Sequence, residues 1–396
     1  MDEKNVKSSS DFNFLNERVV ERRKWNITKL GGFIVFCMIL FILAVFAVIF
    51  WANPYMKDNS DSHSGSASSD DENKETETTT QQISGIEDIA QGVVIMSVNL
   101  DEDMEEVLYK QDIFFSGLVL KMGNEIKILT DCDFVKGKKE ITVYINDKKC
   151  VGKIYGISEE YGVAIISVNV ASNNLEEDDM KCIKCADISL NEENQYAVGD
   201  SIMFVGNTYG KEKFVANGSL TSVENMYNIV DVELEVMNTD ILSSDIKNGF
   251  IFNEQGIAIG MVNSAFNESI TGRNTVFAIS FKRINLYIDK LIRGNQISYL
   301  GIYGRKVIDE VIESIDKDMP YGIYISNTED NSPAYVAGIM KGDILVEFDG
   351  REVVSFDEFS QYLQECGISD EVSVTVMRKG KDGYKEINYM VKIGGR

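Results

Sequence analysis

The chain is poor in two kinds of side chain on which many functions depend, histidine and clustered basic residues. Its 396 residues include a single histidine, His63, and 39 Lys and Arg stand against 63 Asp and Glu, a formal net charge of -24. Binding of nucleic-acid phosphates needs clustered Lys and Arg, so we expect no nucleic-acid partner. A hydroxyl or thiol nucleophile activated by histidine needs an imidazole within hydrogen-bond reach, and His63 is the only one present.

One long uncharged segment lies near the N-terminus. Residues 30–52 contain no charged side chain and are long enough to cross the ~30 Å hydrocarbon core of a bilayer, which predicts a transmembrane helix. A cleaved signal peptide is the alternative, but its apolar part is shorter and ends in small residues, whereas Trp51, Pro54 and Tyr55 follow here. Basic residues gather before the segment, so residues 1–29 are predicted to be cytoplasmic and the rest extracytoplasmic.

The next segment is predicted to be a disordered tether. Residues 53–84 are rich in Ser, Thr, Asp and Glu and have almost no large apolar side chains, so they cannot bury enough surface to fold. As a flexible coil the tether would span on the order of 30 Å. His63 lies within it, away from any folded core.

From residue 86 to 279, short apolar runs alternate with Gly, Asn and Asp, as in GVVIMSV, EIKILT and GIAIGMV. This spacing indicates an all-β sandwich or barrel. The region ends in FKRINLYIDKLI, where Ile284, Tyr287, Ile288 and Leu291 recur at helical spacing. We therefore predict strands followed by one packed helix.

The pattern changes after Ser298 to alternating strands and two short helices over about the ~100 residues of a small domain. Ser332 and Pro333 are typical of an N-cap and a first-turn proline. Ser355 and Glu358 form a capping box at the start of the second helix. These features predict a separate α+β domain.

Several stretches together resemble the HtrA (Deg-type) serine proteases. They are, in family order, SGLVLKMGNEIKILTDCDFV, GVAIISV, VGDSIMFVGNTYG with GSLTSV, NTDILSSDIKNGFIFNEQGIAIGMVN, and SYLGI with SPAYVAGIMKGDILVEFDG. The resemblance implies a mainly β chain: a trypsin-like double β-barrel domain at 85–297 and an α+β PDZ domain at 298–396, preceded by the transmembrane helix.

The resemblance also locates the positions of a catalytic triad. The histidine position is Asp133 in ILTDCDFV, and the aspartate position is Gly162 in YGVAIISV. The serine position is Lys247 when counted back from Asn253, or Asn248 when counted forward from Thr239. Neither residue carries a hydroxyl, so the resemblance implies that the triad is lost. If Lys247 is correct, it should form a salt bridge with Asp133 in the old cleft.

Other chemistry remains open at a few positions. Lys247 lies near Ser243 and Ser244, which would allow a Ser-Lys dyad. Cys182 and Cys185 form a C-x-x-C that could be a redox pair, half a zinc site, a disulfide or two free thiols; Cys132 and Cys150 add two more thiols. The acidic run LEEDDM at 175–180 is interpreted as a solvated loop. We expect no metal and no cofactor.

The family resemblance places a peptide site in the PDZ domain. Tyr299, Leu300, Gly301 and Ile302 match the loop that receives a terminal carboxylate, because backbone N–H groups around a glycine can capture an anion. Phe359 and Leu363, four residues apart on the second helix, either line the side-chain pocket or belong to the core.

The leading hypothesis is a membrane-tethered pseudo-protease that binds unfolded or C-terminal peptide segments outside the cytoplasm, in envelope quality control. The alternative is an active serine-type endopeptidase with a non-standard nucleophile. The resemblance further implies polypeptide partners and either a homotrimer or an association with active HtrA-type proteases.

Overall fold

The computed structural model describes residues 87–99, 112–189, 196–207, 210–242, 246, 248–263 and 275–396. The predicted cytoplasmic segment, transmembrane helix and tether therefore lie outside the described residues. Within the described ranges, none of the helices has the length and apolar character needed to cross a bilayer.

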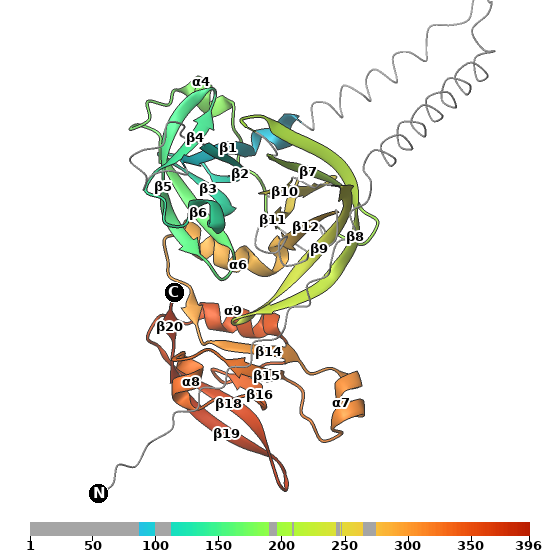
Figure 1. The fold of residues 1–396 in the computed structure, drawn as a ribbon. Coiled ribbons are helices and arrows are strands. Elements are labelled where there is room, and N and C mark those ends of the chain that lie inside the picture. Colours follow the sequence, from blue (N-terminus) through green and yellow to red (C-terminus); the bar gives the residue numbers. More distant parts are fainter. Residues whose placement is uncertain are drawn as a thin grey trace, which may run out of the picture. The chain divides into compact units, whose positions relative to one another are not determined.

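The first of two closed barrels follows the predicted short apolar runs (Figure 1). Its strands are β1 (Val93–Asn99), β2 (Asp112–Lys121), β3 (Glu125–Asp131), β4 (Ile141–Ile145), β5 (Lys148–Ser158) and β6 (Val163–Asn169), hydrogen-bonded in the order β1-β2-β3-β6-β5-β4. Val and Ile residues of these strands alternate inward and fill the barrel, as expected for β-branched side chains on a pleated sheet.

The second barrel contains the longest hairpin of the described chain. Its strands are β7 (Ser201–Asn207), β8 (Lys213–Ile229), β9 (Val232–Leu242), β10 (Asn248–Asn253), β11 (Ala258–Val262) and β12 (Thr275–Ser280), in the order β10-β11-β12-β9-β8-β7. Ile229 pairs with Val232 at the end of the β8–β9 hairpin, so Val230 and Asp231 form a two-residue turn. Asp231 has a positive φ of 60°, which Asp tolerates better than most residues.

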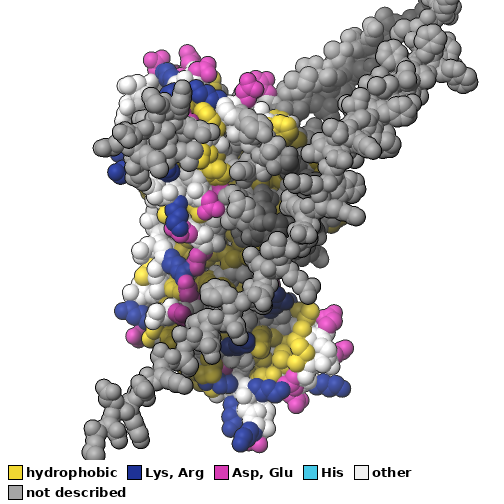
Figure 2. Space-filling view, in the orientation of Figure 1, with side chains coloured by type: hydrophobic (Ala, Val, Ile, Leu, Met, Phe, Trp, Pro, Cys, Tyr) yellow, Lys and Arg dark blue, Asp and Glu magenta, His cyan; other side chains and the backbone are white. Residues whose placement is uncertain are grey.

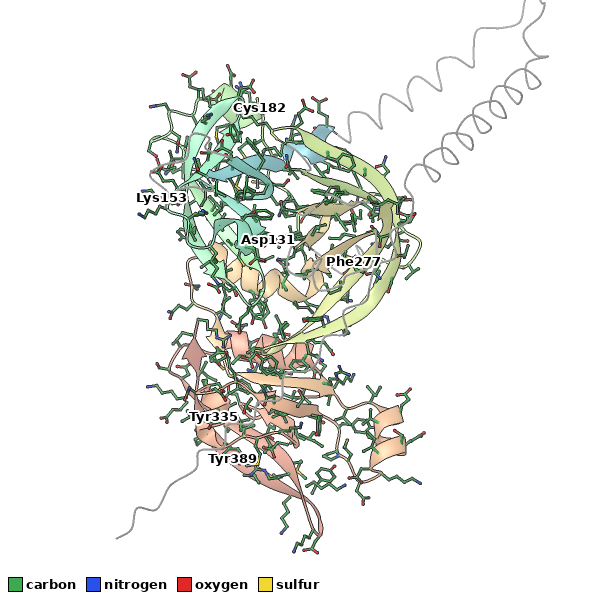
Figure 3. The ribbon with its side chains drawn as sticks, in the orientation of Figure 1. Asp131, Lys153, Cys182, Phe277, Tyr335 and Tyr389 are labelled. Carbon is green, nitrogen blue, oxygen red and sulfur yellow. The ribbon has the colours of Figure 1, made fainter. Side chains whose placement is uncertain are left out.

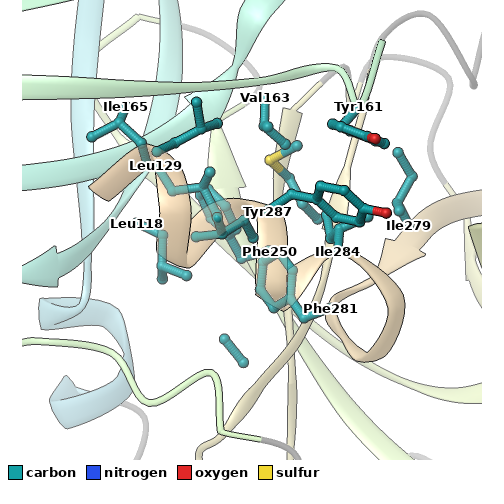
Figure 4. Packing of buried hydrophobic residues seen from close by; sticks show 14 of the residues in the cluster. Leu118, Leu129, Tyr161, Val163, Ile165, Phe250, Ile279, Phe281, Ile284 and Tyr287 are labelled. Carbon is teal, nitrogen blue, oxygen red and sulfur yellow. The ribbon is translucent and has the colours of Figure 1, made fainter. Parts of the chain in front are cut away.

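Helix α6 (Phe281–Ile292) follows the second barrel, as predicted. The Ser280 hydroxyl caps its first turn by accepting a hydrogen bond from the Lys282 N–H, 3.1 Å away. Ile284, Tyr287, Ile288 and Leu291 are buried, in agreement with their spacing. Figure 4 shows this face packed among Leu118, Leu129 and Val163 of the first barrel and Phe250 and Ile279 of the second. The helix therefore joins the cores of the two barrels.

The C-terminal region is the predicted α+β domain. Strands β14 (Ile302–Lys306), β15 (Ile323–Thr328), β16 (Asp343–Phe348), β18 (Glu371–Gly380) and β19 (Gly383–Lys392) form one sheet in that order, with β17 (Arg351–Glu352) paired to β16. Strand β13 (Ser298–Tyr299) pairs with β20 (Gly394–Gly395). Its helices are α7 (Asp309–Ile315), α8 (Pro333–Ala337) and α9 (Phe356–Glu365).

Both predicted helix starts in this region are confirmed. The Ser332 side chain accepts from the Tyr335 N–H and Pro333 opens α8. The Ser355 hydroxyl accepts from the Glu358 N–H at the start of α9, while the Glu358 carboxylate reaches the Val354 N–H, 2.9 Å away. The mainly β class, with two barrels followed by an α+β domain, is therefore as expected.

The acidic run at 175–180 was expected to be a solvated loop, and this is wrong in part. Residues Glu177–Lys181 form a short helix, α4, in which Asp179 is buried. The Asp179 carboxylate accepts from Lys148 Nζ at 2.6 Å and from Asn146 Nδ2 at 2.9 Å, and these partners compensate for its burial.

On the face shown in Figure 2, Lys and Arg side chains are interspersed with Asp and Glu.

Candidate functional site

The segment that carries Asp133 begins where β3 ends. Asp131, labelled in Figure 3, caps the short helix α3 (Cys132–Val135), and its carboxylate accepts from the Asp133 N–H at 3.0 Å. Cys132 is buried, and burial, followed by the charges of Asp131 and Asp133, raises the pKa of its thiol to about 12. The thiol is protonated at neutral pH and is therefore a poor nucleophile or metal ligand, although one ligand atom from each of residues 131–133 lies within 4.8 Å of the others.

Gly162 lies directly beside this helix. Its carbonyl accepts from the Cys132 N–H at 3.1 Å and from Asn263 Nδ2 at 3.0 Å. The fold thus brings the segments of Asp133 and Gly162 together. Gly162 has a φ of +65°, and a Cβ at this position would lie 2.4 Å from Asn263 Nδ2. The Asn263 carboxamide therefore occupies the space that a side chain at position 162 would need.

The structure describes only one of the two residues predicted for the serine position. Lys247, Ser243 and Ser244 lie outside the described residues, so the Asp133–Lys247 salt bridge and the Ser-Lys arrangement stay predictions. Asn248, the alternative residue, is the first residue of β10 and is buried. Its Oδ1 accepts from the Ser116 N–H of β2 at 2.7 Å, which links the two barrels.

Two polar atoms beside this link have no hydrogen-bond partner among the described residues. They are Asn248 Nδ2 and Ser116 Oγ. Thr130 Oγ1 donates to the Ser116 carbonyl at 2.8 Å, so the backbone there is satisfied while the hydroxyl is not. Asn248 carries an amide, which is not a nucleophile; here it holds strands together. The sequence predicted Asn248 as one of two residues at the expected serine position but gave no sign of Ser116.

The loop Tyr299–Ile302 adopts the geometry of an anion site. The N–H groups of Leu300, Gly301 and Ile302 converge on one carboxylate, that of Asp231, with N···O distances of 2.8 to 2.9 Å. Gly301 has a φ of +91°, and a Cβ there would lie 2.2 Å from Ser332 Cβ. A glycine is therefore required to turn the N–H groups inward.

The matched regions of known proteins agree with this architecture. A model of the PDZ domain matches residues 298–388. The "Probable periplasmic serine endoprotease DegP-like" of Halomonas elongata is 25% identical over 258 residues, covering 64% of this chain and 52% of the relative. The "Serine protease Do-like HtrB" of Bacillus subtilis is 24% identical over 291 residues, covering 67% of this chain and 60% of the relative. The chain thus spans little more than half the length of these relatives.

Solved structures show the same fold. "HtrA-type protease AlgW with decapeptide" superposes with a TM-score of 0.57 at 18% identity, covering 79% of this chain and 98% of that one. A serine endoprotease from Yersinia pestis gives a TM-score of 0.51 at 19% identity, covering 79% and 97%. This chain therefore has the fold of these solved proteases. It combines the trypsin-like double barrel with a C-terminal PDZ domain.

Phe359 and Leu363 are completely buried in the core of the PDZ domain. The Phe359 ring packs edge-on against Phe348, with centroids 5.4 Å apart. These contacts favour the core role over a role in a peptide pocket, which stays a prediction. The residue of α9 that contacts the loop's ligand is Ser360, whose Oγ donates to the Asp231 carbonyl at 2.9 Å.

The cysteines within the described residues are free. Cys182 and Cys185 are exposed, and Cys182 lies at the end of α4 (Figure 3), whereas Cys132 and Cys150 are buried. Of the alternatives for the C-x-x-C, the structure has two free thiols and no disulfide between them. Burial raises the pKa of the Cys150 thiol, and partial desolvation of the thiol raises that of the otherwise exposed Cys185, so both are protonated at neutral pH.

Proposed function

We propose that this chain is a membrane-tethered HtrA-type pseudo-protease, which binds unfolded or C-terminal polypeptide segments outside the cytoplasm and does not cleave them. The observation that carries the proposal is the position of the chain's only histidine. His63 precedes both barrels and lies in the segment predicted to be a disordered tether. An HtrA-type serine nucleophile needs an imidazole fixed beside it, and the family resemblance assigns Asp133 to that position.

The surroundings of Gly162 support the same conclusion. The aspartate of a triad must accept a hydrogen bond from the imidazole and hold its tautomer. At position 162 there is no side chain, and Asn263 occupies the adjacent space. A carboxylate could not be introduced there without moving Asn263. The site therefore differs from a working triad in shape as well as in residue type.

Peptide binding is supported by the loop at Tyr299–Ile302. Three converging backbone N–H groups form a site for one carboxylate, and β14 leads directly away from it with an edge on which an extended peptide could pair. The AlgW relative was solved with a decapeptide, which agrees with this use of the domain. We extend peptide binding to the present chain on these grounds.

The membrane tether and extracytoplasmic location rest on the sequence. Residues 30–52 provide the uncharged segment, and the basic residues before it favour a cytoplasmic N-terminus. The relatives named as periplasmic proteases support an extracytoplasmic role in envelope quality control. A homotrimer, or assembly with an active HtrA-type protease, remains part of the proposal; co-purification of a second protease subunit would favour the mixed assembly.

Cleavage is tested with the full chain in detergent micelles. We expect casein and a random peptide library to remain intact by mass spectrometry, and a fluorophosphonate probe to label no residue. Labelling of Ser243 or Ser244 that Lys247→Ala abolishes, together with casein fragments, would establish the Ser-Lys endopeptidase instead. An Asp382→Asn variant, altered at an exposed turn, controls for the change of one side chain.

Peptide binding is tested separately. A fluorescent library of seven-residue peptides is screened against the full chain, and the tightest binder is resynthesised with a free or an amidated C-terminus. The free acid should bind and the amide should not, because the amide cannot supply the charge that the N–H groups of Leu300, Gly301 and Ile302 capture. Equal binding of the two forms would contradict recognition through this loop.

A further inference from the structure

The carboxylate-binding loop of the PDZ domain already contains a carboxylate from the same chain. Asp231, in the turn of the β8–β9 hairpin of the second barrel, is 1% exposed. Its Oδ1 accepts from Gly301 and Ile302, and its Oδ2 accepts from Leu300 and Gly301. Both oxygens are therefore bound by backbone N–H groups that a peptide's terminal carboxylate would need.

The backbone of Asp231 adds to the likeness to a peptide terminus. Its N–H donates to the Ile302 carbonyl at 2.8 Å, at the start of β14. Its own carbonyl accepts from Ser360 Oγ of α9 at 2.9 Å. Asp231 is thus held between the strand and the helix that border the site. A peptide that extended the sheet edge at β14 would use the same Ile302 carbonyl.

The ionisation state of Asp231 favours its binding to the PDZ loop at neutral pH. Burial raises the pKa of Asp231 to about 6, while the backbone N–H groups oppose the shift. The carboxyl is therefore ionised at pH 7, the form in which both oxygens accept the four N–H···O contacts. Without Asp231, three buried N–H groups would lose their acceptor, which is costly unless water or a ligand replaces it.

We propose that Asp231 is an internal competitor of C-terminal peptides, so that a peptide binds only when the β8–β9 hairpin leaves the PDZ loop. The inference rests on the proposed peptide-binding function and adds its regulation. The same three N–H groups would bind either carboxylate, so Asp231 and a peptide exclude each other. Peptide binding would then separate α9 and β14 of the PDZ domain from the second barrel.

Competition by Asp231 should raise the apparent dissociation constant of a C-terminal peptide by a measurable factor. If only a fraction of molecules has an open loop, the apparent dissociation constant exceeds the intrinsic one by the inverse of that fraction. Asp231→Asn replaces one acceptor oxygen by an NH₂ group, which faces N–H donors and cannot bind them. Asp231→Gly removes the carboxylate and also suits the positive φ of 60°. Both variants should keep the turn and open the loop.

The experiment compares the full wild-type chain with Asp231→Asn, Asp231→Gly and the exposed-turn control Asp382→Asn. Hydrogen exchange of the Leu300, Gly301 and Ile302 amides reports occupation of the loop without any added ligand. Titration with the tightest free-acid peptide of the library reports affinity. We expect exchange at least about tenfold faster and binding at least about tenfold tighter in both Asp231 variants, and wild-type values in the control.

Amide exchange and peptide affinity together distinguish failure of the competition by Asp231 from failure of the proposed peptide binding. Equal amide exchange and equal peptide affinity in the wild type and both Asp231 variants would overturn the competition while leaving peptide binding in place. Faster exchange with no free-acid peptide bound by any variant would instead overturn the peptide-binding function, and with it displacement by peptides.

Discussion

The backbone turn at Gly162 leaves no space for a side chain. Its φ of +65° disfavours other residues, and Asn263 Nδ2 would lie 2.4 Å from an added Cβ. Left-handed backbone costs a residue with a Cβ roughly 1–2 kcal/mol, and the close contact adds to this. The backbone conformation and the packing at position 162 therefore require a glycine.

We predict that Gly162→Ala lowers the free energy of unfolding by at least about 1 kcal/mol. The matched control is Gly123→Ala, because a Cβ at Gly123 meets no atom within 4 Å and its φ is not in the left-handed range. Urea unfolding of both variants and the wild type measures the difference. Coincident midpoints for all three proteins would show that the turn at 162 accepts a side chain.

Asp179 provides a second test at the residue scale. Hydrogen bonds from Lys148, the Glu176 N–H and Asn146 lower its pKa from 3.8 to about 2. A carboxyl whose pKa is lowered on folding stabilises the protein while ionised; this contribution is complete above about pH 4 and is lost as the pH falls toward 2. Asp179→Asn should therefore destabilise the first barrel at pH 7 and flatten the loss of stability between about pH 4 and pH 2.

The control for Asp179 is Asp178→Asn on the same helix. The Asp178 side chain is 85% exposed and pairs at the surface with Lys181. Its removal should leave both the urea midpoint at pH 7 and the pH dependence close to those of the wild type. If the two variants had the same pH profile, the buried hydrogen bonds of Asp179 would not be the cause of its lowered pKa.

At the scale of elements, the spacing of hydrophobic residues predicted the strands and the helix whose formation depends on local sequence. The strands follow the short apolar runs, and α6 has the predicted buried face. The caps at Ser332 and Ser355 were also predictable, because a cap depends on residues only three apart. In contrast, α4 was missed, since its acidic residues have no apolar face and its start depends on hydrogen bonds around Asp179.

The candidate sites show the same division. Motifs led to the prediction for Asp133 and Gly162, which stays a prediction. The position of Asn263 beside Gly162 depends on residues about 100 apart in the sequence. The loop at Leu300–Ile302 was predicted as a carboxylate site, whereas its ligand was not. Asp231 looks like an ordinary turn residue in IVDVE, and only the fold brings it to a loop about 70 residues away.

Helix α6 allows a prediction at this scale. Ile288 is completely buried between the barrels, while Leu286 on the same helix is 39% exposed. Ile288→Ala should lower the free energy of unfolding by about 2–5 kcal/mol, because it leaves a cavity in a packed core. Leu286→Ala should change it far less. Urea unfolding monitored by far-ultraviolet circular dichroism measures the free energy of unfolding of both variants. A similar decrease in the two would contradict the packing of α6.

At the scale of the molecule, the second barrel and the PDZ domain are joined by more than the Asp231 carboxylate. Arg283 of α6 forms an ion pair with Asp357 of α9, and the side chains are 14% and 56% exposed. This pair lies on the same helices that border the hairpin and the loop. It should therefore favour the same docked arrangement, with a smaller contribution because Asp357 is partly solvated.

This linkage predicts how two changes combine. Asp357→Asn alone should raise the affinity for the free-acid peptide, by less than Asp231→Asn does, because it weakens docking without emptying the loop. In the Asp231→Asn background the loop is already open, so adding Asp357→Asn should have no further effect. Peptide titrations of the wild type, both single variants and the double variant form the cycle. Independent, additive gains would mean that the two residues act on separate equilibria, and the single docked state inferred for the chain would have to be abandoned.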